Sequence, residues 1–225
     1  MKKGRFMLES LGHRFAVSGA PGFGKTYFSK RLFREHKGKA IFFDTVGALN
    51  DLVEYYRTFK IKPRIDAWDY RKIFSELATR EKIILDLSSL IPAERKNFAD
   101  GLLVQVLNRK WQNFALFFDE AHQYVPQKMN VYSHEVLRTV QTGRNHGITP
   151  IGLVTQNLAD VEASVLANCE SFIIFHTVYP TALDRLEKLF QLEAERWEIL
   201  RRNITTLNVG EFILYRNGNY AVYRR

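Results

Sequence analysis

The chain has 225 residues, a length that suits one large α/β domain or two small ones. Its 33 Lys and Arg against 24 Asp and Glu give a formal net charge of +9, which favours a polyanionic partner but also fits a solvated basic surface. The single cysteine, Cys169, excludes an internal disulfide and a multi-cysteine zinc site. No apolar run approaches the roughly 20 residues of a membrane-spanning helix, so we expect a cytoplasmic protein that is not an integral membrane protein.

Apolar runs alternate with segments of helical periodicity along most of the chain. Strands are predicted at residues 13–18, 39–44, 82–87, 114–119, 149–155 and 172–176, with a further short one indicated at 64–67. Helices are predicted at residues 26–36, 46–59, 70–79, 92–111, 133–145, 182–190 and 193–202. Near the C-terminus, strand-like runs at residues 211–215 and 220–224 flank Asn217-Gly218, a strong hairpin signal.

This alternation predicts an α/β fold with a mainly parallel sheet, covered by helices on both faces, and a C-terminal β-hairpin. The sequence contains no internal repeat or low-complexity linker that would divide it. We therefore expect a single domain over residues 1–225, with residues 204–225 as the hairpin extension.

One segment matches the G-x-x-x-x-G-K-S/T pattern of a nucleotide phosphate-binding loop, between the first predicted strand and the first predicted helix. The matching residues are Gly19, Ala20, Pro21, Gly22, Phe23, Gly24, Lys25 and Thr26. Glycines let backbone N–H groups turn inward around an anion, Lys25 can reach the β- and γ-phosphates, and the Thr26 hydroxyl can ligate Mg²⁺. We expect ATP and Mg²⁺ as cofactors, with this loop and the adjoining Tyr27 as the cofactor-binding residues.

The predicted strand at residues 114–119 ends in an acidic pair, Asp119 and Glu120. Asp119 is a candidate for the Mg²⁺ shell and Glu120 for the carboxylate that polarises the attacking water, because phosphoryl transfer depends mostly on positioning and charge stabilisation. The alternative is that both acids merely cap the following helix. The letters from Asp119 to His122 also spell a helicase box, but such helicases need two motor domains and this chain has the length of one.

Two further polar residues are candidates for the same site. Gln156 follows the predicted strand at residues 149–155, where a polar side chain can sense the γ-phosphate; otherwise it is an ordinary loop residue. Arg144 precedes that strand, and it is either a helix C-terminal cation or an arginine finger that stabilises transition-state charge. The residue types alone do not separate these alternatives.

The order of motifs resembles the HerA/FtsK superfamily of ring-forming, DNA-pumping ATPases. The resemblance covers residues 19–218 and rests on the segments GAPGFGKT, IILDLSSL, ALFFDEAHQYVP, TGRNHGITPIGLVTQNLADV, VLANCESFIIFHT and LNVGEFILYRNG. It implies a RecA-like P-loop core, a hexameric homo-oligomeric ring around double-stranded DNA, and ATP sites at subunit interfaces. It further implies that Lys25 and Glu120 are catalytic, that Gln156 is the sensor, and that Arg144 is a finger acting on the neighbouring subunit.

The chain departs from several members of that superfamily. Because the first predicted strand begins by about residue 13 and no apolar run is long enough, we expect no N-terminal β-barrel, membrane span or winged helix; Asn157 stands where the family often has arginine. A bare motor of this size most resembles viral genome-packaging ATPases, which implies host cytoplasm or the virion as its place and a portal, membrane protein or nuclease as a partner. A HerA-like cellular or plasmid DNA-processing translocase and a phage morphogenesis ATPase are the alternatives. Residues 60–64 and 127–132 are candidate DNA-contacting loops, with solvated turns as the alternative.

Overall fold

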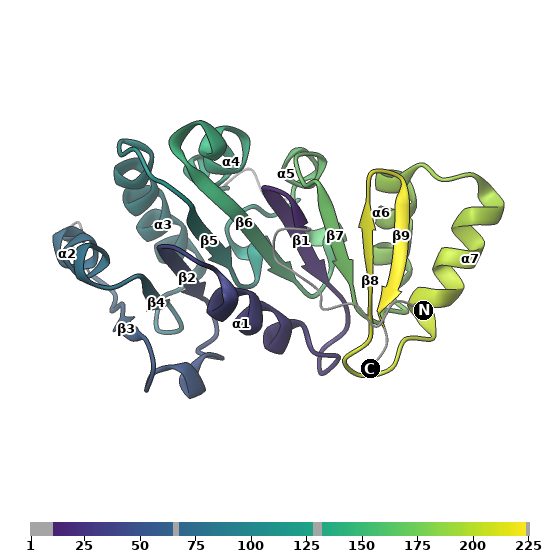
Figure 1. Cartoon of the computed structure of the whole chain (residues 1–225), viewed down its shortest axis with the longest axis horizontal. Coiled ribbons are helices and arrows are strands. Elements are labelled where there is room, and N and C mark those ends of the chain that lie inside the picture. The colour runs from purple at the N-terminus through teal and green to yellow at the C-terminus, as the bar shows by residue number, and fades with distance from the viewer. Residues whose placement is uncertain (1–10, 65–67, 128–131, 224–225) are drawn as a thin grey trace.

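The computed structural model describes residues 11–64, 68–127 and 132–223 of the chain. In these residues a single nine-stranded sheet runs in the order β3-β4-β2-β5-β6-β1-β7-β8-β9 (Figure 1). The strands are β1 (Arg14–Ser18), β2 (Ala40–Asp44), β3 (Arg57–Lys60), β4 (Lys82–Asp86), β5 (Phe114–Phe118), β6 (Ile148–Thr155), β7 (Ser171–Ile174), β8 (Phe212–Arg216) and β9 (Asn219–Tyr223). Strands β1 to β7 pair in parallel, whereas β8 and β9 are antiparallel.

Helices cover both faces of the sheet, as the sequence predicts. The α-helices are α1 (Lys25–Glu35), α2 (Arg71–Thr79), α3 (Pro92–Leu107), α4 (His134–Thr142), α5 (Ala163–Ala167), α6 (Pro180–Phe190) and α7 (Ala194–Thr205). Helix α1 packs on one face, where Phe28, Leu32 and Phe33 join a core with alternate strand residues. Apolar residues of all the other α-helices belong to the core on the opposite face. Within the described residues, no helix is long and apolar enough to cross a bilayer.

The predicted helix at residues 46–59 is wrong. The chain instead forms a short 3₁₀-helix, η2 (Asn50–Leu52), and then the edge strand β3, which pairs with β4. Gly47 has a φ of 73°, a left-handed conformation that interrupts a helix at its start. Aromatic and β-branched side chains such as Thr58 and Phe59 also suit a pleated edge strand. The further strand indicated at residues 64–67 has its last three positions outside the described residues.

The remaining elements differ from prediction mainly at their ends. Helix α3 ends at Leu107, and the helix predicted to reach residue 145 divides into α4 and a 3₁₀-turn, η4 (Gly143–His146). The short α5 and the 3₁₀-helices η3 (Ala121–Gln123) and η5 (Leu158–Asp160) carry no periodicity long enough to predict. The C-terminal hairpin forms as expected, and β8 extends the sheet by pairing with β7.

Candidate functional site

The candidate phosphate-binding loop connects the C-terminal end of β1 to the start of α1 (Figure 1). All three of its glycines, Gly19, Gly22 and Gly24, have positive φ values. A Cβ on Gly19 would lie 2.7 Å from the Phe175 Cβ, and its φ of 147° is one that other residues rarely adopt. Gly24 precedes α1 with a φ of 110°. The local backbone therefore has the close packing and positive φ values predicted for a loop that turns its N–H groups toward an anion.

Lys25 lies at the first position of α1 and is buried. Its Nζ donates to the backbone oxygen of Ala20, within the loop, at 2.9 Å. Burial lowers the pKa of Lys25, while the charges of Glu120 and Asp119 raise it. The fold thus brings the predicted loop cation to the predicted acidic pair, although about 95 residues of chain separate them. Thr26 lies in the same turn of α1 and is half-buried, whereas Tyr27 is exposed.

Asp119 is the first residue after β5, at the same edge of the sheet as the loop. Burial raises its pKa to about 7, with further contributions from the negative charges of Glu120 and Asp44. Asp44, which ends β2, accepts hydrogen bonds from the backbone N–H groups of Ala48 and Leu49, both at 3.0 Å. Buried carboxylates concentrated at one edge favour a cation at this position.

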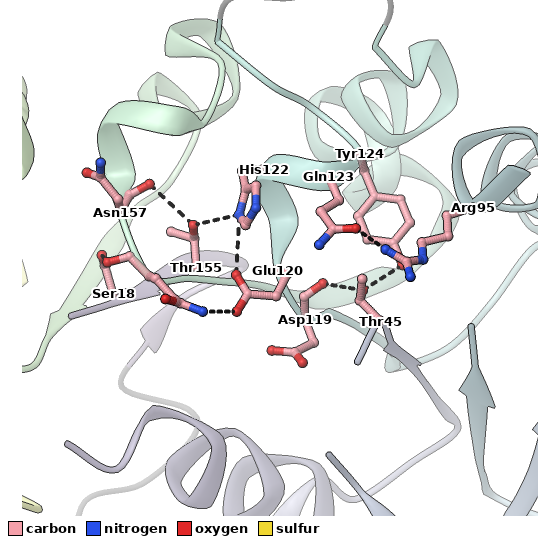
Figure 2. A network of polar contacts seen from close by, with 11 residues as sticks. Ser18, Thr45, Arg95, Asp119, Glu120, His122, Gln123, Tyr124, Thr155 and Asn157 are labelled. Atoms are coloured by element: carbon pink, nitrogen blue, oxygen red, sulfur yellow. Dashed lines mark hydrogen bonds and ion pairs between the residues drawn. The ribbon is translucent and has the colours of Figure 1, made fainter. Parts of the chain in front are cut away.

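Two side chains contact the Glu120 carboxylate, one from the segment after β6 and one from η3 (Figure 2). Gln156 Nε2 donates to Glu120 Oε1 at 2.7 Å, so the predicted sensor and the predicted catalytic acid contact each other directly. His122 Nδ1 lies 3.3 Å from Glu120 Oε2 and 3.3 Å from the Thr155 hydroxyl. That buried Oε2 accepts no hydrogen bond. One carboxylate oxygen is thus fixed by an amide, and the other faces an imidazole.

A buried hydrogen-bond relay fixes the backbone beside the acidic pair (Figure 2). The Thr45 hydroxyl donates to the Asp119 backbone oxygen at 2.6 Å. Because its single proton is used there, Thr45 accepts from the fully buried hydroxyl of Tyr124, 3.0 Å away. Tyr124 is anchored in turn among the rings of Phe43 and Phe118. The relay links β2, β5 and η3 at the point where Asp119 leaves its strand.

Replacing Thr45 by valine keeps its shape but leaves the Tyr124 hydroxyl and the Asp119 carbonyl without their shared partner. Burying unsatisfied polar groups costs about 1–3 kcal/mol, and we expect the free energy of unfolding to fall by that amount. Urea denaturation followed by circular dichroism measures it. Thr45→Ser keeps the hydroxyl and is the control; equal stability of the valine and serine variants would contradict a structural role for the relay.

Arg144 does not lie in this site. It is exposed on η4, before β6 begins, whereas Gln156 follows the end of that strand. Strand β6 has eight residues, and at ~3.3 Å per residue it separates the two side chains by roughly 25 Å. Arg144 therefore lies at the N-terminal ends of the parallel strands, whereas the phosphate-binding loop lies at their C-terminal ends. The geometry places Arg144 beyond reach of a nucleotide on its own subunit.

The sequence did not indicate several residues that shape the site: Asp44, Thr45, His122, Tyr124 and Thr155. Asp44 carried a usable signal, because it also ends a buried strand of the parallel sheet. The others are recognisable only through contacts between segments distant in the chain. Within the described ranges, no group of three or more His, Cys, Asp or Glu side chains is arranged to hold a metal ion by itself.

Comparisons with known proteins agree with this architecture. No protein-family model matches the chain. A protein of Methanocaldococcus jannaschii named "Probable helicase MJ1565" is 26% identical over 168 residues, which cover 74% of this chain but only 29% of that protein. The chain therefore matches less than a third of the length of this relative.

Solved structures share nearly the whole fold. The genome packaging NTPase B204 from Sulfolobus turreted icosahedral virus 2 has a TM-score of 0.67 at 16% identity, covering 94% of this chain and 96% of that chain. VirB4 of Thermoanaerobacter pseudethanolicus has a TM-score of 0.65 at 11% identity, covering 93% of this chain and 88% of that chain. The predicted α/β fold, with its mainly parallel sheet and C-terminal hairpin, is confirmed: this chain has the fold of P-loop ATPases.

Proposed function

We propose that this chain hydrolyses ATP and couples the hydrolysis to the movement of double-stranded DNA. The observation that carries the ATPase assignment is the meeting of Lys25 with Asp119 and Glu120 beside a loop of phosphate-binding shape. Phosphoryl transfer needs positioned charge more than covalent chemistry, and these residues supply both a cation and a carboxylate at one edge. B204, which shares the fold, has been solved in complex with ATP-gammaS, and this supports the same ligand here.

In this proposal each residue has a separate task. Residues 19–26 hold the phosphates, with Lys25 moving from the Ala20 oxygen toward the β- and γ-phosphates. The Thr26 hydroxyl and the Asp119 carboxylate would hold Mg²⁺, a hard cation that is commonly bound by one or two protein oxygens together with substrate phosphates. When bound, the ion neutralises charge on the phosphates. The buried position of Asp119, beside the negative charges of Glu120 and Asp44, fits this role.

Glu120 accepts a proton from, or orients, the water that attacks the γ-phosphate. In the present arrangement one of its oxygens is bound to Gln156 Nε2. A γ-phosphate beside Gln156 would compete for that amide and free the carboxylate. Gln156 would thus report the presence of the γ-phosphate to the catalytic acid.

The proposal that the protein binds and moves DNA rests on the net charge of +9 and on the fold shared with a genome packaging NTPase. The test compares ATPase rates with and without duplex DNA at several salt concentrations, together with the mass of the protein in solution. We expect stimulation by DNA that weakens with salt, and an assembly larger than a monomer. A monomer whose ATPase ignores DNA at every salt concentration would contradict the proposal.

Viral genome packaging is the form of DNA movement that we favour, with a HerA-like cellular or plasmid translocase as the alternative. A phage morphogenesis ATPase, which uses nucleotide for assembly, is the third candidate. Displacement of a triplex-forming strand from duplex DNA separates translocases from assembly ATPases. Sustained ATP turnover without any displacement would favour assembly.

Arg144 lies at the end of the strands opposite its own phosphate loop, and we therefore propose that it acts on the nucleotide of a neighbouring subunit. Arg144→Ala and Lys25→Ala should each abolish most ATPase activity alone. Mixing them should restore part of it, because some interfaces then combine an intact Arg144 with an intact Lys25. Arg138→Ala, on the exposed side of α4, is the matched control and should stay active. No recovery despite confirmed co-assembly would refute the trans role.

A further inference from the structure

The order of the strands determines which way a bound nucleotide must point. Strands β6 and β5 lie on one side of β1, and β7 and β8 lie on the other. Asp119 and Glu120 follow β5 and Gln156 follows β6, so the proposed hydrolytic groups all lie on the β6 side of the phosphate loop. A γ-phosphate that faces these groups leaves the nucleoside on the opposite side, toward β7 and β8.

On that opposite side, residues 208–211 form a turn that leads into β8; we call it the hairpin-entry turn. It is locked internally, because the buried carboxylate of Glu211 accepts from the Asn208 backbone N–H at 2.9 Å and from its side-chain amide at 3.1 Å. The Glu211 N–H donates back to the Asn208 oxygen at 3.0 Å. Between these residues the Val209 side chain is 60% exposed.

The hairpin-entry turn contacts the phosphate loop directly. The Gly210 N–H donates to the Phe23 backbone oxygen at 3.1 Å, and a Cβ built on Gly24 would lie 3.6 Å from the Gly210 Cα. The turn is therefore not part of a separate appendage, because its backbone lies against the loop that would hold the phosphates. Its only large apolar side chain, Val209, is left outside that contact.

Helix α1 presents an aromatic ring to the same region. Phe28, four residues after Gly24, packs against Phe212 at 5.0 Å between ring centroids. Tyr27 precedes Phe28 in the same first turn of α1, three residues after Gly24. Its side chain is 68% exposed. Tyr27 and Val209 are thus exposed apolar side chains on the two segments that adjoin the phosphate loop here, the first turn of α1 and the hairpin-entry turn.

We infer that Tyr27 and Val209 form the nucleobase subsite, in which the ring of a purine nucleoside triphosphate packs against the Tyr27 ring and the Val209 methyl groups. The inference rests on the proposed function, since it takes the phosphates to lie on residues 19–26. An aromatic face and an aliphatic surface beside an anion-binding loop match the two parts of a nucleotide, which are an apolar ring and a charged tail. The C-terminal hairpin thereby belongs to the nucleotide site.

The test measures the affinity for ATP and for inorganic tripolyphosphate, both with Mg²⁺, by competition with a fluorescent nucleotide or by calorimetry. Tripolyphosphate has the charged tail without the base. Tyr27→Ala should weaken ATP binding by about five- to tenfold, the size of a lost ring contact, and the uncharged Val209→Ser should weaken it less; both should leave tripolyphosphate binding unchanged. Both side chains are exposed, so circular dichroism should show an unaltered fold.

Tyr55→Ala is the matched control, because Tyr55 is 67% exposed but lies beyond β2, on the other side of the phosphate loop. It should bind both ligands as the parent chain does. The inference is overturned if Tyr27→Ala and Val209→Ser bind ATP like the control, or if they weaken both ligands equally. Lys25→Ala should weaken both ligands; if it weakens neither, the proposed function itself has failed, whatever the other variants do.

Discussion

Replacing Glu120 by glutamine should leave ATP binding intact and reduce ATP turnover by about 10²- to 10⁴-fold, the usual contribution of a positioned general base. Glutamine has the same shape, and its side-chain oxygen can still accept from Gln156 Nε2, as Glu120 Oε1 does at 2.7 Å. The change therefore removes proton acceptance while keeping the contact that positions the side chain. It also removes a negative charge beside Asp119, so binding of the phosphates should not weaken.

Single-turnover hydrolysis and equilibrium ATP binding, measured on the same preparation, separate these two effects. Glu198→Gln provides a control with the same chemical change on exposed α7, where Glu198 pairs with Arg201 at 3.4 Å. The control should hydrolyse ATP at the parent rate. Unchanged turnover in Glu120→Gln would remove Glu120 from the mechanism.

Replacing Lys25 by alanine should have the second large effect, this time on binding. The Lys25 ammonium group donates to the Ala20 oxygen inside the candidate phosphate loop at 2.9 Å. Losing hydrogen bonds to a charged group costs about 1.5–3 kcal/mol, or roughly 10- to 150-fold in affinity. The loss also takes away a positive charge that lowers the pKa of Asp119. We expect weak ATP binding and no measurable steady-state turnover.

Lys30→Ala is the control for this experiment, since Lys30 lies on the same helix but pairs with Asp51 at 2.5 Å instead of facing the loop. It should bind and hydrolyse ATP normally. If Lys25→Ala binds ATP with the parent affinity, residues 19–26 are a structural turn and the proposed site must be abandoned.

The sequence predicted most of the sheet because its strands are short, nearly continuous apolar runs separated by helical periodicity. Strand β5 is an example, with every residue buried. Prediction failed at residues 46–59, where apolar spacing alone suggested a helix. The left-handed Gly47 and the pairing of β3 with β4 override that local pattern, and neither is visible without the folded chain.

The candidate site likewise contains residues that the sequence predicted and residues that it did not. Lys25 and the acidic pair were predictable because each has a residue type and a position, at a strand end or a loop, that its chemistry requires. The Thr45 hydroxyl and the Tyr124 ring were not, because 79 positions separate them and both are common core residues. The separation of Arg144 from the phosphate loop was also not predictable, because it depends on the length and direction of β6.

The backbone conformation of Glu120 costs folding free energy. Its φ of 49° and ψ of 54° are left-handed, a conformation that glycine or asparagine adopts with little strain and glutamate does not. Holding a glutamate there costs roughly 1 kcal/mol of folding free energy. In the described part of the chain the non-glycine residues with a left-handed backbone are Asn113, Glu120, Gln191 and Asn217, and Glu120 among them is the one proposed to act on water.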